Sequence, residues 1–488
     1  MIPVLSRDPR TGESRGQVAW EADTAAVAAA AKGAHASLDA LAGRPARAAL
    51  LRAWAGAVES RASELVAEAD AETALGSPRL SGELARVAYQ FRFFAEVVED
   101  GAFLGVVIDR PDPSAVPPRP ELRRWKVPLG AVGVFAASNF PFAFSVPGAD
   151  TASAIAAGCP VVVKAHPDHP GTSELVAGTL RTAAEEAGLP AGVLTVLHGY
   201  QAGLDLVRHP LIAAVGFTGS VPGGRALFDV AVARPVPIPF YGELGSLNPV
   251  LVTERAAAAR ADEIADGLVA SYTLGQGQFC TKPGLVLVPA GQAGDELAAA
   301  AARNAAGAPP GPLLDARMRG HFLDGFAARA AVPGVRTLAA AAAAPTGDSP
   351  QAVRAGLLEV DAADLGGDLL DECFGPVTIL VRYRDEADAE AALARLGGNL
   401  TATLHTEVAE PGAAAWLARL SRLAGRVVFG GWPTGVAVAP AMTHGGPYPA
   451  TTSPTTSVGG SAIERWLRPV TFQAAPPGLL PPELAGPA

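Results

Sequence analysis

Cysteine is scarce in this chain of 488 residues, which contains only Cys159, Cys280 and Cys373. The number is odd and no CxxC pair occurs, so the sequence favours neither a disulfide framework nor a thiolate zinc site. Thiols that remain free are typical of a reducing compartment. We therefore expect a cytoplasmic protein without a bound metal.

Excess positive charge and long apolar runs are also missing. The formal net charge of −10 opposes nonspecific attraction to nucleic acids and to anionic lipids. No apolar run reaches the roughly 18 residues of a membrane span, and the start, MIPVLSRDPRTGESRG, has no basic flank followed by an apolar stretch. The sequence thus favours a small soluble partner molecule over a nucleic acid or a membrane.

The composition is that of a globular α/β protein, with 49% hydrophobic and 18% charged residues. Apolar positions recur every three or four residues over 24–99, which predicts a helical N-terminal part. Residues 109–128 are rich in proline and charge, which predicts an extended excursion from the core. The alanine run at 339–344 predicts the end of a surface helix or a loop. No internal repeat is found.

From Gly130 onward, short apolar segments alternate with segments of helical period. Such alternation indicates parallel βαβ units, which bind ligands at the carboxyl ends of their strands. A second set follows, with a helix over 261–274 between strands at 248–253 and 284–289. The strands of the first set are predicted at 131–137, 160–164, 193–198 and 213–217.

Six polar motifs follow one another along the chain, most of them where these strands end. In this order they resemble the motifs of the aldehyde dehydrogenase superfamily, and the resemblance runs from DPRTGE near the start to RWLRPVTFQ near the end. No single motif is specific enough to establish this resemblance. The motifs are ASNFPF with Asn139, KAHPDHPGTSE with Lys164, GFTGSVPGG with Gly219 and Ser220, GELGSLNP with Glu243, GQFCTKPG with Cys280, and ECFGPV with Glu372 and Phe374.

The resemblance implies an α/β fold with three parts. A Rossmann-type cofactor domain with a parallel sheet would comprise 1–108 and 129–243, and a second α/β catalytic domain would comprise 244–440. A small β oligomerisation element would be formed by strands within 109–128 and 462–475. In the family such a tail extends a sheet across a dimer, so we expect a homodimer or a homotetramer.

Cys280 is by resemblance the catalytic nucleophile. A thiol with a pKa of about 8.5 is a few per cent thiolate at neutral pH, which is enough to attack an aldehyde carbon. The alternative is a small buried hydrophobe, the common fate of a free cysteine, but the polar, glycine-flanked setting disfavours it. Cys159 opens an apolar strand and is expected to be buried, while Cys373 is expected to pack rather than react.

Four further residues could take part in the reaction. The amide of Asn139 matches the family donor that stabilises the oxyanion, although it could also be a turn residue before Phe-Pro. Glu243 matches the general base, and burial could raise its pKa toward neutrality. His444 in MTHGGPYPA is either a proton relay or a loop histidine. Arg92 could meet a substrate carboxylate, although a structural ion pair is favoured.

The cofactor residues are implied in the same way. Lys164 ends a buried strand, where an unpaired ammonium is costly, so a ribose hydroxyl is a suitable partner. Gly219 and Ser220 stand in a strand–turn–helix that can present N–H groups to a pyrophosphate, without the GxGxxG fingerprint. Glu372 and Phe374 match the residues that hold the nicotinamide ribose and ring, and Phe374 could otherwise belong to the core.

Pro167 stands where most superfamily members carry a glutamate that binds the adenosine ribose. This loop, ETALGSPRLSGE, GQFCTKPGLV and the tail from THGGPYPA onward resemble NADP-accepting aldehyde dehydrogenases and α-ketoglutarate semialdehyde (2,5-dioxopentanoate) dehydrogenases. Losing a carboxylate permits a 2′-phosphate, but no arginine precedes Arg208 in the next loop, so the cofactor is NADP or NAD. His166 and His169 are read as loop residues, not metal ligands.

The implied function is NAD(P)-dependent oxidation of an aldehyde through a cysteine thiohemiacetal and thioester, with 2,5-dioxopentanoate giving 2-oxoglutarate. A broad-specificity or long-chain aldehyde dehydrogenase is the alternative. A noncatalytic binding member of the fold is disfavoured because Cys280, Glu243 and Asn139 are all present. A CoA-acylating enzyme is disfavoured because it would not need Glu243.

Overall fold

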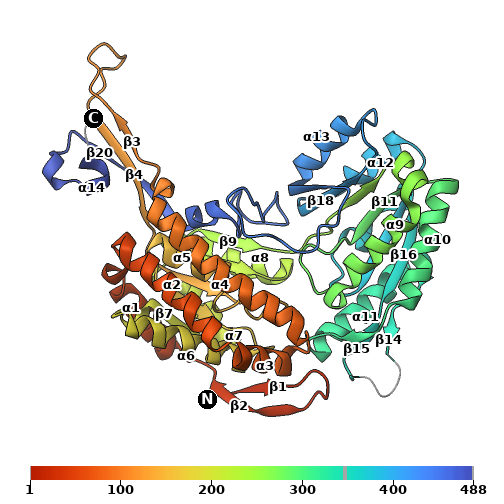
Figure 1. The fold of residues 1–488 in the computed structure, drawn as a ribbon, viewed down its shortest axis with the longest axis horizontal. Coiled ribbons are helices and arrows are strands. Elements are labelled where there is room, and N and C mark those ends of the chain that lie inside the picture. Colours follow the sequence, from red (N-terminus) through yellow and green to blue (C-terminus); the bar gives the residue numbers. More distant parts are fainter. Residues whose placement is uncertain (1, 345–348, 486–488) are drawn as a thin grey trace.

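The structure is a computed structural model that describes residues 2–344 and 349–485. It opens with the antiparallel pair β1 (Pro3–Arg7) and β2 (Ser14–Trp20). The helical N-terminal part predicted from the apolar period then follows (Figure 1). Its helices are α1 (Thr24–Ala36), α2 (Arg44–Ser60), α3 (Ala62–Thr73) and α4 (Ser77–Asp100).

A five-stranded parallel sheet of order β7-β6-β5-β8-β9 follows these helices. The four strands predicted from the sequence are confirmed within one or two residues, and β9 is added. The chain steps from β5 to one side and then returns with β8 to the other, which makes a topological switch point. The strands are β5 (Ala131–Phe135), β6 (Val161–Lys164), β7 (Leu194–Leu197), β8 (Ile212–Thr218) and β9 (Phe240–Glu243).

Helices connect these strands, as parallel pairing requires. They are α5 (Ala149–Ala157), α6 (Pro170–Glu186), α7 (Tyr200–Arg208) and α8 (Val221–Val232).

A seven-stranded sheet of order β13-β16-β17-β11-β10-β18-β19 forms the second α/β unit. Only β13 runs antiparallel to its neighbour. The strands are β10 (Val250–Val252), β11 (Leu285–Pro289), β13 (Arg336–Ala339), β16 (Gly356–Asp361), β17 (Val377–Tyr383), β18 (Asn399–His405) and β19 (Ala424–Phe429). The helices are α9 (Glu254–Thr273), α10 (Gln292–Gly307), α11 (Ala316–Ala330), α12 (Glu386–Leu393) and α13 (Ala413–Leu423).

The alanine run at 339–344 departs from the prediction, because it is neither a helix end nor a plain loop. Ala339 ends β13, and β14 (Ala342–Ala343) pairs with β15 (Ala352–Arg354), which also pairs with β12 (Gly311–Pro312). Tertiary strand pairing here overrides the helix propensity of alanine.

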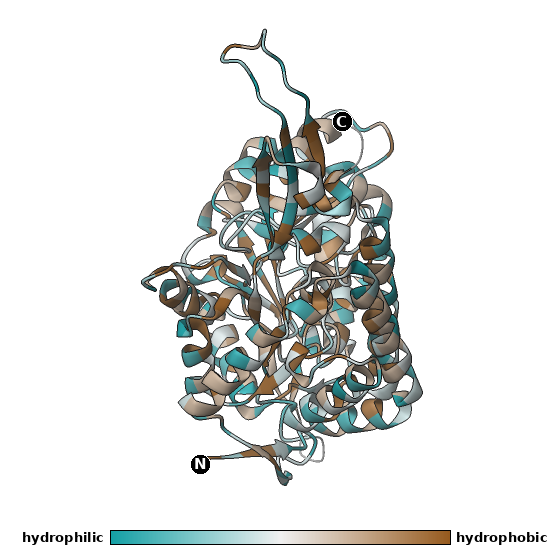
Figure 2. Cartoon of the chain, turned by 90° about the vertical axis from the view of Figure 1, so that its left-hand side faces the viewer, coloured by the Kyte–Doolittle hydropathy of each residue, from teal (hydrophilic) through white to brown (hydrophobic). Residues whose placement is uncertain are grey.

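A three-stranded sheet of order β20-β4-β3 projects from the body of the molecule (Figures 1 and 2). It is built from β3 (Val107–Asp109), β4 (Leu122–Pro128) and β20 (Leu467–Gln473). The tail strand β20 pairs antiparallel with β4 from Leu467 opposite Pro128 to Gln473 opposite Leu122. The proline-rich excursion and the tail therefore meet within one chain, and β20 and β3 are the free edges.

None of the helices in the described part of the chain combines the length and the apolar character needed to cross a bilayer.

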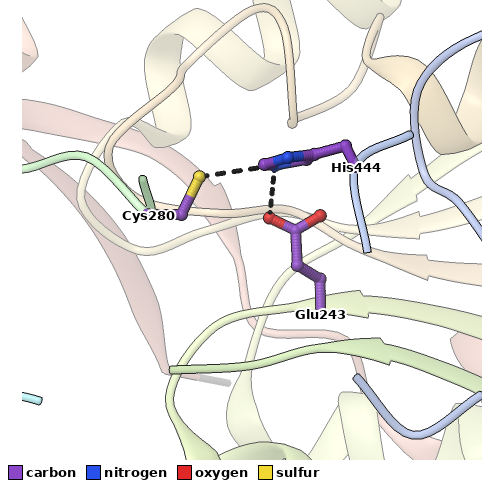
Figure 3. A group of neighbouring side chains, drawn as sticks. All are labelled: Glu243, Cys280 and His444. Carbon is purple, nitrogen blue, oxygen red and sulfur yellow. Dashed lines mark hydrogen bonds and ion pairs between the residues drawn. The ribbon is translucent and has the colours of Figure 1, made fainter. Parts of the chain in front are cut away.

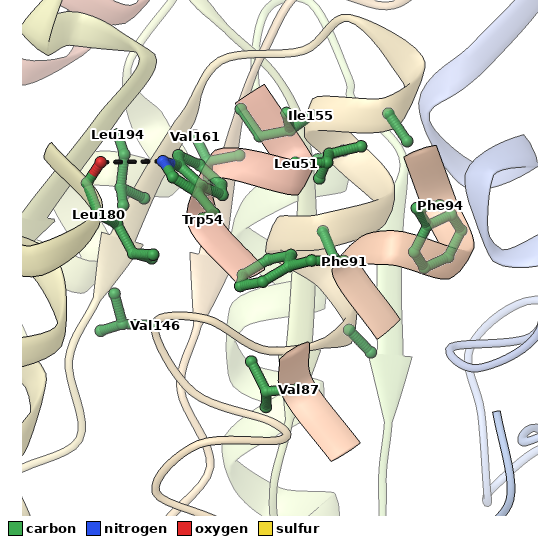
Figure 4. Packing of buried hydrophobic residues seen from close by; sticks show 14 of the residues in the cluster. Leu51, Trp54, Val87, Phe91, Phe94, Val146, Ile155, Val161, Leu180 and Leu194 are labelled. Carbon is green, nitrogen blue, oxygen red and sulfur yellow. Dashed lines mark hydrogen bonds between the residues drawn. The ribbon is translucent and has the colours of Figure 1, made fainter. Parts of the chain in front are cut away.

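The largest core lies between the N-terminal helices and the first sheet (Figure 4). Phe91 of α4 and Trp54 of α2 pack edge to face with ring centroids 5.5 Å apart, and the indole Nε1 of Trp54 donates to the carbonyl of Leu180 at 2.8 Å. Cys159 belongs to this core, and Cys373 to the core of the second sheet. Both cysteines are buried, as the sequence predicted.

We predict that truncating the Phe91 ring destabilises the protein. A buried Phe→Ala change typically costs about 3–5 kcal/mol because lost burial is added to a cavity. Phe91→Ala should therefore lower the thermal unfolding midpoint clearly more than Phe91→Leu, which refills part of the space. Equal midpoints for the two variants would show that the ring does not carry this packing.

Candidate active site

Cys280 lies in a tight loop between α9 and β11. Gly275, Gln276 and Gly277 all have left-handed backbone, with φ of 54°, 56° and 66°. A Cβ on Gly277 would lie 2.3 Å from the carbonyl oxygen of Gly375, so only glycine lets this loop pack against the segment that follows Glu372. Gly277, three residues before the cysteine, thus allows the two backbone segments to pack closely.

A buried asparagine fixes the backbone of this loop. The Nδ2 of Asn248 donates to the carbonyl oxygens of Cys280 at 2.8 Å and Lys282 at 2.9 Å. Asn248 is itself held because the Oδ1 of Asn399 accepts from its N–H at 3.0 Å. Sequence reasoning missed both asparagines, although Asn248 lies within the motif GELGSLNP. Its φ of 50°, unusual for a residue other than glycine, cannot be read from the sequence.

Three side chains from distant segments meet at the nucleophile (Figure 3). The Sγ of Cys280 lies 3.5 Å from the Nε2 of His444, and the same Nε2 lies 2.9 Å from the Oε1 of Glu243. His444 is fully buried. The structure therefore brings His444 into contact with both Cys280 and Glu243, and its role as a proton relay remains a prediction.

Glu243 is held as a carboxylate. Burial acts to raise its pKa, but the charge and hydrogen bond of His444 and the Ser457 hydroxyl, which donates at 2.7 Å, outweigh burial and leave the pKa below its usual value. The expectation that burial would raise this pKa toward neutrality is wrong. The sequence did not reveal the two partners, which lie some 200 residues further along the chain.

Ser457 and His444 reach Glu243 because the C-terminal segment runs along β9. The N–H of Leu244 donates to the carbonyl of Ala450 at 2.7 Å, and the N–H of Thr452 donates to the carbonyl of Gly242 at 3.0 Å. These contacts fix the segment against the edge of the first sheet.

Cys280 differs from the other cysteines in being partly exposed. Burial of its sulfur, followed by the charges of Glu243 and Glu372, raises the pKa of the thiol well above its ordinary value. The expected few per cent of thiolate is therefore an overestimate for this resting site. The thiol must lose its proton before it can attack a carbon atom.

The thiol, imidazole and carboxylate ligand atoms of this group all lie within 4.8 Å of one another. Such a spacing also suits a divalent ion, and the absence of a metal remains a prediction from the sequence.

His166 and His169 are each held by a protein group. His169 contacts the carbonyl of Ala137 at 2.9 Å, and His166 lies 3.3 Å from a carboxylate oxygen of Asp168.

Asn139 follows β5 and is anchored to the nucleophile loop. Its Nδ2 donates to the carbonyl of Gln278 at 2.9 Å, and Arg79 donates to its backbone carbonyl at 2.6 Å. A side-chain amide carries two N–H groups, and this bond uses one. The position suits a donor that completes an oxyanion hole with the Cys280 backbone.

A cavity of about 530 Å³ opens beyond the end of β6. Lys164 lines it together with Pro167 and Tyr200, and the Nζ of Lys164 lies 5.0 Å from the centroid of the Tyr200 ring. Burial lowers the pKa of Lys164 to about 8. Arg317 of α11 lines the same cavity, and the motif around Lys164 does not reveal it because α11 lies about 150 residues further along the chain.

The carboxyl ends of the neighbouring strands suit the rest of a dinucleotide. Ser220 caps α8 with its Oγ accepting from the N–H of Gly223 at 3.3 Å, and Gly219 and Ser220 are exposed. Burial raises the pKa of Glu372 to about 7. Phe374 is only partly buried and lies outside the core clusters of the described residues. An anion-binding helix start, together with this cavity of mixed charge at the carboxyl end of the sheet, fits a nicotinamide dinucleotide.

Arg92 of α4 forms an ion pair with Glu59. Its guanidinium lies 2.5 Å from a carboxylate oxygen of Glu59, and both side chains are about half exposed. The favoured reading as a structural ion pair is confirmed, and a contact with a substrate carboxylate stays an untested prediction.

Comparison with known proteins places these motifs in one family. The model for the aldehyde dehydrogenase family matches residues 3–447. The chain is 48% identical over 484 residues to alpha-ketoglutaric semialdehyde dehydrogenase 2 of Azospirillum brasilense, covering 97% of this chain and 92% of that protein. It is 43% identical over 433 residues to the alpha-ketoglutaric semialdehyde dehydrogenase of Acinetobacter baylyi, covering 87% and 81% respectively.

A solved structure shares the fold. The 1-pyrroline-5-carboxylate dehydrogenase from Thermus with bound NAD superposes with a TM-score of 0.82 at 22% identity, covering 96% of this chain and 89% of that one. At this identity the likeness concerns the fold alone. The resemblance carried by the six motifs is confirmed by the family match over most of the sequence: the chain belongs to the aldehyde dehydrogenase family.

Proposed function

We propose that this protein is an NAD(P)-dependent dehydrogenase that oxidises 2,5-dioxopentanoate to 2-oxoglutarate. The observation that carries the chemistry is the buried contact of Cys280 with His444 and of His444 with Glu243. The choice of substrate is supported by two relatives, at 48% and 43% identity, that are named alpha-ketoglutaric semialdehyde dehydrogenases.

The cofactor would be held by residues at the carboxyl ends of the first sheet. Lys164 would bind the adenosine ribose, and Gly219 and Ser220 at the start of α8 would bind the pyrophosphate. Glu372 and Phe374 would hold the nicotinamide ribose and ring. The nicotinamide supplies a hydride acceptor when it is bound.

The first half of the reaction needs a nucleophile and an oxyanion hole. Cys280 gives its proton to solvent, and the thiolate forms a bond to the aldehyde carbon, which gives a thiohemiacetal. Asn139 and the backbone N–H of Cys280 donate to the oxyanion. Loss of the hydride then leaves a thioester on Cys280.

The second half needs a base for water. Glu243 is ionised at neutral pH because His444 and Ser457 lower its pKa, so it can accept a proton from the attacking water. The hydroxyl adds to the thioester carbon, the bond to Cys280 breaks, and the sulfur takes up the proton that Glu243 removed from the water. The product is a carboxylate.

We further propose that the free edge of β20 extends a sheet across a homodimer, alone or within a tetramer. Seven residues of this edge strand lack a partner on their outer side in the described chain, and an open edge is a template for another strand. The cofactor domain would be 1–108 with 129–243, and the catalytic domain 244–440. A cytoplasmic location suits a reaction that needs a reduced thiol.

A steady-state assay of both cofactors against several aldehydes tests the activity. We expect kcat/KM for 2,5-dioxopentanoate to exceed that for hexanal, because only the former carries a carboxylate. Cys280→Ala should abolish turnover but retain nucleotide binding. A preference for hexanal would favour the long-chain alternative, and near wild-type turnover of Cys280→Ala would overturn the mechanism.

We predict that Glu243 and Asn139 act in different halves of the cycle. Glu243→Gln keeps the shape but cannot accept a proton, so a burst of up to one NAD(P)H per site should precede slow turnover, with the acyl group on Cys280 detected by mass. Asn139→Ala should lose both burst rate and turnover, by roughly 10²- to 10³-fold in kcat. Normal steady turnover in Glu243→Gln would contradict this division.

We predict that the loop after β6 sets the cofactor preference. Pro167→Glu should lower the NADP to NAD ratio of kcat/KM by about tenfold, since a carboxylate in this cavity repels a 2′-phosphate and can bind a ribose diol. Pro167→Gln is the uncharged control and should change the ratio less. An unchanged ratio in Pro167→Glu would show that this loop does not face the ribose.

A further inference from the structure

Arg86 of α4 carries a guanidinium that the described protein leaves unsatisfied. Its Nη1 and Nη2 are both buried and have no hydrogen-bond partner among the described residues. Its Nε makes only a long contact of 3.4 Å to the carbonyl of Val436. A guanidinium has five N–H donors, and leaving buried donors of a cation unpaired is costly. A missing acceptor would relieve this cost.

The unsatisfied group is linked to the reacting sulfur through two aromatic rings. The Cζ of Arg86 lies 5.4 Å from the centroid of the Phe144 ring, which in turn lies 5.8 Å from the centroid of the His444 ring. His444 contacts Cys280. Burial lowers the pKa of Arg86, whereas the charges of Glu83, Cys280 and Glu243 act to raise it, so the guanidinium is within electrostatic reach of the site.

The nearby carboxylates have other partners. Glu243 is bound by His444 and Ser457. The Oε1 of Glu83 accepts from the backbone N–H groups of Phe142 and Ala143, each at 2.8 Å, and no ion pair joins Glu83 to Arg86 in the described structure.

The nearby arginines also differ from Arg86. Arg79 lies over the rings of Phe140 and Phe279 and donates to a backbone carbonyl. Both terminal nitrogens of Arg426 donate to backbone carbonyls. Arg86 is thus the guanidinium near Cys280 whose two terminal nitrogens are both left without an acceptor in the described chain.

We propose that Arg86 is the residue that binds the carboxylate of the substrate and so determines its specificity. The proposal rests on the proposed function and adds a subsite to it. A carboxylate accepts two parallel N–H bonds from a guanidinium, and Nη1 and Nη2 supply this pair. With the carboxylate held at Arg86, the short chain of a ω-oxo acid extends past Phe144, and its aldehyde carbon meets Cys280.

The test removes the charge and keeps the bulk. Arg86→Met should lower kcat/KM for 2,5-dioxopentanoate by about 10²- to 10³-fold, mainly through KM, because a charged hydrogen-bonded pair is lost. For pentanal, which has the same chain length without the carboxylate, kcat/KM should change by less than about threefold. Arg86→Lys keeps the charge without the fork, so it should fall between wild type and Arg86→Met.

Arg92→Met is the matched control on the same helix, since Arg92 is paired with Glu59 at the surface. It should leave both substrates unchanged. NADPH binding, followed by its fluorescence, should be equal in wild type and all variants, which also reports on folding. A similar loss for pentanal and for the dioxo acid in Arg86→Met, or an unchanged preference in both Arg86 variants, would overturn the proposal.

A third substrate separates this proposal from the choice of 2,5-dioxopentanoate. Suppose wild type prefers succinate semialdehyde, a shorter ω-oxo acid, and Arg86→Met loses that preference. The carboxylate subsite is then supported although the proposed substrate is wrong. If wild type shows no preference for any ω-oxo acid over pentanal, the subsite itself is wrong.

Discussion

The buried carboxylate of Glu243 is the interaction on which the site depends. It ends β9, receives the Ser457 hydroxyl, and lies 2.9 Å from His444, which contacts the sulfur of Cys280. A charge this deeply buried is tolerated only with such partners. The pairing of the C-terminal segment with β9 therefore does more than close the fold, because it places the groups that keep Glu243 ionised.

The same surroundings shift the pKa values of Cys280 and Glu243 in opposite directions. Burial and neighbouring carboxylates raise the pKa of Cys280, while His444 and Ser457 lower that of Glu243. Opposite shifts of neighbouring groups assign an acid and a base. The resting site thus has a protonated thiol and an ionised carboxylate, and a protonated thiol is less exposed to oxidation than a thiolate.

Local charge and net charge act at different ranges. The net charge of −10 repels polyanions from the surface as a whole, since many phosphates meet it at once. Within the molecule, Lys164 and Arg317 line the cavity beyond β6, and Arg86 lies near Cys280. The same cavity also holds carboxylates, among them Glu21 and Asp315, so charges of both signs act there on a small ligand that fits where a polymer cannot.

The sequence by itself determined the parallel sheet, the family and the burial of Cys159 and Cys373, and it singled out Cys280 and Glu243 as candidates for nucleophile and base. These features can be read from the sequence alone, because strand periodicity, glycine placement and motif order depend on residues close together in the chain. Only the tertiary structure decided how His444 and Ser457 meet Glu243, that Glu243 is held ionised, and that Arg92 pairs with Glu59. These outcomes depend on which face of a helix packs inward and on contacts between residues some 200 positions apart. The electrostatics of a buried group are set by neighbours in space, and no local pattern in the sequence encodes them.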